Sequence, residues 1–173
     1  MKSIRTILFA IATIGLTIPA YASDLMQPIV PLTAGLSTFN VASGSGEILS
    51  ITGSNGNRAA ILQSDRNNRT VQAIFGTGNH LIAGINGRGN NVLQMSVGHN
   101  NSQNLGVTGQ NNNVAFVQRG NNMNANLLVD NARNANVIAI QAHPNQLMPI
   151  SISGLRNTTV IVGPGRMYVF PHR

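Results

Sequence analysis

The chain has 173 residues, contains no cysteine, and consists of only 4% aromatic and 9% charged residues. Charged residues make up about a quarter of an ordinary soluble domain, and an exported protein without cysteine has no disulfide bonds to stabilise it. This composition disfavours a conventional soluble enzyme. It indicates that order comes from backbone hydrogen bonds and stacked side chains.

Residues 1–22 have the pattern of a secretory signal peptide. A lysine and an arginine precede the apolar run 7–18, and the Ala-Tyr-Ala of residues 20–22 offers a cleavage site. The apolar run is shorter than the roughly 20 residues that span a membrane. We therefore expect a mature exported protein of residues 23–173, in which nine arginines against four carboxylates give a net charge of about +5.

Residues 23–52 do not share the pattern of the rest of the chain, and we interpret them as an N-terminal leader or linker. Pro28 and Pro31 interrupt the start, and residues 43–46 read Ser-Gly-Ser-Gly, which is typical of a flexible link. A second interpretation stays open, in which this segment is an address read by a secretion pore.

Residues 53–155 repeat every eleven residues, which indicates a stacked-repeat architecture. The asparagine column contains Asn57, Asn68, Asn79, Asn90, Asn101 and Asn112, is interrupted at Met123, and continues with Asn134 and Asn145. A glycine column three residues earlier contains Gly76, Gly87, Gly98, Gly109 and Gly120. Glycine and asparagine accept the left-handed backbone conformations that tight turns need.

We therefore predict that each unit consists of about seven strand residues followed by four turn residues. Glycine and asparagine recur too often for helix interiors. Two units make one strand–turn–strand coil of 22 residues, so the predicted fold is an all-β, cross-β solenoid of between four and five coils.

Alternation along each strand places the asparagine on one face together with glutamines and apolar residues. The glutamines on these faces are Gln63, Gln72, Gln94 and Gln118. Identical amides stacked about 4.8 Å apart hydrogen-bond up the column as ladders. We interpret both the asparagines and these glutamines as structural ladder residues.

Residues 156–173 predict a basic β-hairpin, because two apolar runs at 158–162 and 166–170 flank Gly163-Pro164-Gly165. Two interpretations remain open. The hairpin is either a cap that closes the last coil, as stacked repeats need, or an element that tethers the chain to a surface.

The sequence predicts no catalytic, cofactor-binding or metal-binding residues, because the four carboxylates are scattered and no histidine has metal-ligand spacing. Five arginines lie at or beside the predicted turns: Arg58, Arg66, Arg69, Arg88 and Arg119. Their like charges either prevent lateral association of neighbouring molecules by repulsion, or they bind an anionic polysaccharide, lipid or DNA. Few aromatic residues are present for base stacking, so specific nucleic-acid recognition is not expected.

The repeat resembles that of the curlins, the subunits of bacterial curli amyloid fibres. Residues 57–63 read Asn-Arg-Ala-Ala-Ile-Leu-Gln and match the motif Asn-x-Ala-x-x-x-Gln. Residues 112–118 match it with valine for alanine and continue into Arg-Gly-Asn-Asn at 119–122. The resemblance covers about residues 53–145.

The resemblance implies a fibre subunit that crosses the periplasm and leaves through an outer-membrane secretion pore. It further implies polymerisation at the cell surface with other curlin subunits, in adhesion and biofilm matrix. The basic end resembles that of a minor, nucleating subunit, and nucleation and elongation both stay open. A hypothesis from another class is a secreted monomeric solenoid adhesin that binds anionic glycan through its asparagine and arginine faces.

Overall fold

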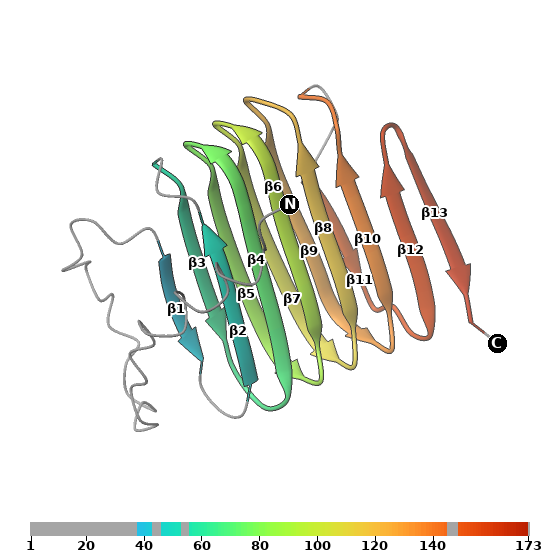
Figure 1. Ribbon diagram of the computed structural model, residues 1–173. Coiled ribbons are helices and arrows are strands. Elements are labelled where there is room, and N and C mark those ends of the chain that lie inside the picture. Colours follow the sequence, from blue (N-terminus) through green and yellow to red (C-terminus); the bar gives the residue numbers. More distant parts are fainter. Residues whose placement is uncertain (1–37, 43–45, 53–55, 145–148, 173) are drawn as a thin grey trace, which may run out of the picture.

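The computed structural model describes residues 38–42, 46–52, 56–144 and 149–172, and these residues form strands and turns without a helix (Figure 1). In this part of the chain the strands are β1 (Thr38–Ala42), β2 (Gly46–Thr52), β3 (Arg58–Gln63), β4 (Asn68–Thr77), β5 (His80–Arg88), β6 (Asn91–His99), β7 (Ser102–Gln110), β8 (Asn113–Arg119), β9 (Asn124–Arg133), β10 (Asn136–Gln141), β11 (Pro149–Ser153), β12 (Thr158–Gly163) and β13 (Arg166–Pro171).

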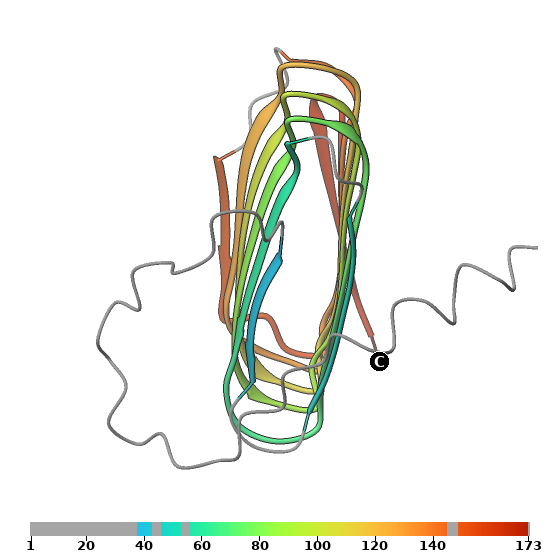
Figure 2. The same cartoon turned by 60° about the vertical axis from the view of Figure 1, so that its left-hand side comes forward.

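Successive strands alternate between two sheets that face each other (Figure 2). Sheet A has the order β1-β3-β5-β7-β9-β11, and sheet B has the order β13-β12-β10-β8-β6-β4-β2. All neighbours are parallel except the pair β12 and β13. The chain is therefore a β-solenoid of about five coils of roughly 22 residues, which confirms the predicted fold. The stack begins with β1 and β2, before the boundary at residue 53 that the repeat predicted.

The register in sheet A is constant from β3 to the start of β9, whereas β1 pairs with β3 at an offset of 21 residues. Ile61 pairs with Ala83, Ala83 with Leu105, and Leu105 with Leu127, a step of 22 each time. After Gly109 the step becomes 23, because Asn131 is inserted with a left-handed φ of 49° and forms a bulge. The bulge absorbs the extra residue near the end of β9, so the strands beyond it keep their inward and outward faces.

The interior follows the predicted alternation in most strands, including β3, β5 and β10, where every second residue is buried. In β5, Leu81, Ala83 and Ile85 are buried while Ile82 points outward. The main apolar cluster extends from Ile61 to Val162 along the length of the stack. Aliphatic side chains and amides share this interior, because the spacing of identical positions in parallel strands lets both kinds stack.

The strands are longer than the predicted seven residues because the hydrogen-bonded register continues through the glycine column. Gly76, Gly87, Gly98 and Gly109 lie within β4 to β7 rather than in separate turns. Gly87 has a φ of 116°, and a Cβ atom there would lie 1.9 Å from the carbonyl oxygen of Gly109 in the next coil. The close stacking of backbone on backbone at this corner therefore requires glycine.

The C-terminal strands form the predicted hairpin. β12 and β13 pair antiparallel, with Val160 opposite Val169 and Gly163 opposite Arg166. The two-residue turn is Pro164-Gly165, with a left-handed φ of 69° at Gly165. Because β13 follows β12 in sheet B, this sheet has seven strands and sheet A has six.

Candidate assembly surfaces

The predicted asparagine column divides into two ladders, one at each corner of the coil. The first contains Asn57, Asn79 and Asn101, all buried. The Oδ1 atom of Asn57 accepts from the backbone N–H and the side-chain amide of Asn79, at 3.0 and 3.2 Å. The Oδ1 atom of Asn79 accepts from the backbone of Asn101 at 3.1 Å. At Met123 only the backbone N–H continues the contact, at 3.1 Å from Oδ1 of Asn101.

The second ladder contains Asn68, Asn90 and Asn112. The Oδ1 atom of Asn68 accepts from the backbone and side chain of Asn90 at 2.9 and 3.1 Å, and Asn90 repeats the pattern with Asn112 at 3.2 and 3.0 Å. Beyond the bulge, Ala135 takes the next position and donates its backbone N–H to Asn112 at 3.0 Å.

Asn134 therefore lies one residue away from the ladder that its spacing predicted. It is an exposed turn residue with a φ of 51°, and its side-chain amide donates to Oδ1 of Asn157 at 3.1 Å. Asn145 lies outside the described residues. The inserted Asn131 shifts the numbering, so a constant step of eleven arrives at Asn134 although Ala135 occupies the ladder position.

Each ladder amide also donates a hydrogen bond to the glycine corner of the adjacent coil. The side-chain amides of Asn57, Asn79 and Asn101 donate to the carbonyl oxygens of Gly76, Gly98 and Gly120 at 2.8, 2.8 and 2.7 Å. A buried amide that loses its partners costs about 1–3 kcal/mol. The asparagine and glycine columns thus form one unit, in which the amide satisfies a carbonyl that the glycine places within reach.

The predicted glutamines form shorter stacks than the asparagines. Gln72 donates to Gln94, and Gln118 donates to Gln141, both at 2.7 Å. Gln63 instead accepts from the hydroxyl of Thr70 at 2.6 Å and donates to the carbonyl of Asn68 at 3.0 Å. All of these side chains are buried.

Sequence reasoning missed two further buried amides, Gln103 and Gln141. Gln103 stands on the inward face of β7 and donates to the carbonyl of Met95 at 2.9 Å. The signal for it was its position two residues after a ladder asparagine, which places both side chains on the inward face. Gln141 becomes visible when residues 136–141 are aligned with 113–118, because both segments begin with Asn-Val and end with glutamine.

The outer faces of the two sheets differ in chemistry. In sheet B an apolar column runs across the strands through Leu49, Val71, Leu93, Ala115, Ile138 and Ile161. In sheet A the matching column contains Leu62, Gly84, Gly106, Leu128 and Ser151. Contiguous exposed apolar surface is typical of interaction sites, and sheet B has the more continuous apolar column of the two.

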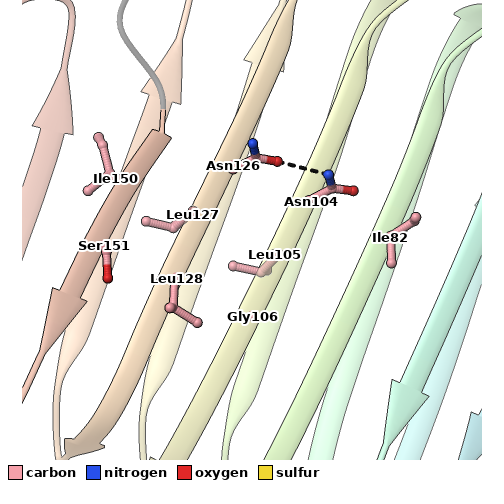
Figure 3. A pocket seen from close by; sticks show the side chains of 9 residues that line it. All are labelled: Ile82, Asn104, Leu105, Gly106, Asn126, Leu127, Leu128, Ile150 and Ser151. Carbon is pink, nitrogen blue, oxygen red and sulfur yellow. Dashed lines mark hydrogen bonds between the residues drawn. The ribbon is translucent and has the colours of Figure 1, made fainter.

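A shallow hollow lies over Gly106 on the outer face of sheet A (Figure 3). Ile82, Leu128 and Ile150 border it, and the amide of Asn104 donates to Asn126 at 2.8 Å along its upper edge. None of the residues that line it carries a titratable side chain. The hollow therefore offers the hydroxyl of Ser151 but no acid or base beside it that could activate this hydroxyl.

Arginines gather along one turn edge of the stack. Arg88 pairs with Gln110, Gln110 with Arg133, and Arg133 with Arg156. The backbone carbonyl of Arg66 accepts from Gly89, so Arg66 lies at the same edge. All four arginines are exposed, and they form a basic edge that includes Arg66 and Arg88 from the predicted set.

The other three predicted arginines do not join the basic edge. Arg58 begins β3 on the outer face of sheet A, Arg119 ends β8, and Arg69 lies on the outer face of sheet B. Arg69 forms an ion pair with Glu47 at 3.1 Å, with side chains 59% and 67% exposed. An ion pair this exposed adds about 0–1 kcal/mol to stability.

Both ends of the stack present strand edges. Among the described strands, β1 and β2 pair on one side only at the first end, and β11 and β13 do so at the second (Figure 1). Strand edges with unpaired backbone groups are templates for pairing with another chain. The two ends and the apolar face of sheet B are thus the candidate surfaces for contact with another chain.

Within the described ranges, no three side chains of histidine, aspartate or glutamate gather closely enough to hold a metal ion. No long apolar helix able to cross a bilayer is found in the same ranges. Comparison with protein-family models, with curated proteins and with solved structures finds no match.

Proposed function

We propose that this protein is a secreted structural subunit that assembles into curli-like amyloid fibres by cross-β stacking. The observation that carries the proposal is the continuous parallel pairing of coils of about 22 residues, with asparagine ladders running along the stacking axis. Nothing in the geometry of such coils limits the length of the stack. Each coil ends in a strand edge of the same kind as the edge on which it formed, so a further coil can pair there.

Stacking between copies repeats contacts that exist between coils. Each added coil forms two parallel strand pairings, and a pairing such as that of β4 with β6 spans residues Arg69 to Thr77. Each hydrogen bond adds about 0.5–1.5 kcal/mol, so two strand pairings together hold a junction firmly. The low content of charged residues, 9%, leaves little repulsion to oppose it.

The proposed location follows from the N-terminal pattern and the resemblance of the repeat. Residues 1–22 would direct export, and the mature chain would pass the periplasm and an outer-membrane secretion pore before joining a surface fibre. Its partners would be further copies of itself and other curlin subunits. Adhesion and biofilm matrix are the roles that such a fibre supports.

The first test replaces the ladder Asn57, Asn79 and Asn101 together by aspartate in residues 23–173. Stacked buried carboxylates repel each other at strand spacing, so we expect thioflavin-T fluorescence and fibres in electron micrographs to be lost. The matched control places the same three charges at exposed asparagines of sheet A, by Asn86→Asp, Asn104→Asp and Asn126→Asp, and should still assemble. Equal assembly of both triple variants would contradict the ladder role.

The basic edge supports a second candidate function, the binding of an anionic surface glycan. Arg66, Arg88, Arg133 and Arg156 present like charges along one line, which suits a linear polyanion better than a compact ligand. We expect retention on heparin that falls with salt and weakens severalfold when these four arginines become glutamine. The change Arg58→Gln with Arg119→Gln, away from the edge, should have a much smaller effect; equal weakening would contradict the edge as the site.

A further inference from the structure

The two sheets end differently at the C-terminal end of the stack. Sheet A stops at β11, whereas sheet B continues past β12 to β13. Opposite residues in an antiparallel pair share a face, so Met167 and Val169 lie on the same inner face as Val162 and Val160. Yet Val160 and Val162 are 0% and 4% exposed, while Val169 and Met167 are 51% and 57% exposed. The inner face of β13 therefore lacks one covering strand in sheet A.

The first coil of a second copy has the strands to continue both sheets. β1 pairs parallel with β3, with Asn40 opposite Ile61 and Ala42 opposite Gln63, an offset of 21 residues where the later pairs of sheet A have 22 or 23. Continued on β11, that register sets Asn40 of the second copy beside Ile150 and Ala42 beside Ile152. The same copy's β2 then belongs beside β12, where β13 already lies.

With β13 in place, a second copy completes only one of the two sheets. If its β1 pairs with β11, its β2 meets the position that β13 occupies. If its β2 instead pairs with β13, the two strands run antiparallel, because β13 runs opposite to the other strands of sheet B. This arrangement also leaves a gap of one strand in sheet A. Continuous stacking at this end therefore requires β13 to leave β12.

β13 is the most exposed strand of the described stack, and we infer that it is held less firmly than the strands between two neighbours. All six of its residues are exposed, and it pairs with β12 on one side only among the described strands. Tyr168 and Phe170 stack on each other, with ring centroids 6.4 Å apart, on the outer face rather than in the core. Proline followed by glycine with positive φ is typical of a type II turn, whereas two-residue hairpins favour the mirror-image turns that match strand twist.

We propose that β13 is a removable edge guard, which covers the C-terminal edge of sheet B until the first coil of a second copy replaces it. The proposal rests on the proposed function in that the incoming partner is a second copy. It adds a control point: the C-terminal end accepts a new subunit at the rate at which β13 is displaced. The bare inner face of β13 and the open edge of β11 form the initial docking surface.

The test uses full-length mature variants that release or lock the strand. In this hairpin the backbone N–H groups of Arg166, Tyr168 and Phe170 face β12, because hydrogen-bonded pairs alternate from the turn. The change Tyr168→Pro removes such a donor, while Val169→Pro removes an N–H that points to the open edge and is the matched control. A disulfide from Thr158→Cys with Pro171→Cys, which form an opposite pair, locks β13 in place.

We measure self-association by sedimentation and fibre growth on preformed seeds by thioflavin-T fluorescence. Loss of one hydrogen bond raises the released fraction about fivefold, so Tyr168→Pro should grow about fivefold faster than Val169→Pro. The locked variant should stop growing when oxidised and recover when reduced.

Fibres that grow equally fast in the locked and reduced forms would overturn the edge guard and leave the fibre function standing. Association that requires release of β13 but stops at short, non-fibrillar oligomers would support the guard and contradict the fibre function. Absence of association in every variant, Tyr168→Pro included, would overturn both.

Discussion

The coils before Gly120 and the coils after it have the same backbone arrangement with different interiors. The earlier interior contains the asparagine ladders, together with the buried amides of Gln72, Gln94 and Gln103. The later interior is mainly aliphatic, with Leu127, Val129, Val137, Ala139, Val160 and Val162 buried, and it retains the buried amide of Gln141. Parallel pairing nevertheless continues from one set of coils to the other.

This difference indicates that the backbone register and the turn geometry define the coil. The side-chain ladders are one way to fill the interior of the coil. Met123 and Ala135 end the two ladders, yet both donate a backbone N–H to the asparagine of the preceding coil. At the turn, Asn131 supplies the left-handed conformation and Ala132 then replaces the glycine. Side-chain chemistry changes while the backbone contacts persist.

The largest effect should come from placing a side chain at the glycine corner of the early coils. Gly87→Val brings a β-branched residue to a φ of 116° and a Cβ within 1.9 Å of the Gly109 carbonyl oxygen. Strain and overpacking together should lower the free energy of unfolding by about 3–5 kcal/mol, measured by urea denaturation of the soluble chain.

The corresponding control in the late coils is Ala132→Gly. Because a residue with a Cβ already stands there, the change should cost only about 0.5–1 kcal/mol, as for an ordinary strand glycine. If both changes destabilised the chain equally, the two halves would not differ in how their corners are built.

A smaller effect should follow from removing one ladder amide. Asn90→Ala leaves Asn68 and Asn112 without their side-chain partner and exposes the Gly109 carbonyl to an unfilled space. We expect a loss of about 2–4 kcal/mol in the same measurement. Asn134→Gly keeps the left-handed turn conformation outside the ladder and should change stability by less than about 0.5 kcal/mol; a larger cost there would restore Asn134 to the ladder.

The smallest of the three effects should come from the glutamine stack. Gln94→Leu keeps the side-chain volume and removes the acceptor of Gln72, whose amide still donates to the carbonyl of Ala60 at 3.2 Å. Because Gln72 retains this partner, the cost should be about 1–2 kcal/mol. A cost as large as that of Asn90→Ala would mean that glutamines and asparagines contribute alike.

The sequence alone predicts the strands, their inward faces, the glycine corners and most ladder residues, because all of these depend on a fixed period. It does not place Asn134 correctly, since one inserted residue in a turn leaves no mark on composition and yet moves every later position. It also does not reveal that the glycines lie within the strands. Glycine is used both at a bend inside a strand and in a separate turn, so the sequence does not distinguish the two. The pairing of β1 and β2 depends on the edges that later coils offer, which no local pattern contains.

The unequal sheet ends have the same origin. The hairpin at 158–171 is predictable from its Gly-Pro-Gly turn, but its position as a seventh strand of sheet B depends on how many strands sheet A has received. That count results from the alternation of the whole chain and not from the hairpin itself.

The central claim is that the solenoid axis is the fibre axis, and X-ray diffraction from aligned fibres of residues 23–173 tests it most directly. We expect a sharp reflection at about 4.8 Å along the fibre axis and one near 10 Å across it, from strand spacing and sheet separation. A chain that stays monomeric at high concentration for days, or fibres with the 4.8 Å reflection across the axis, would contradict the account.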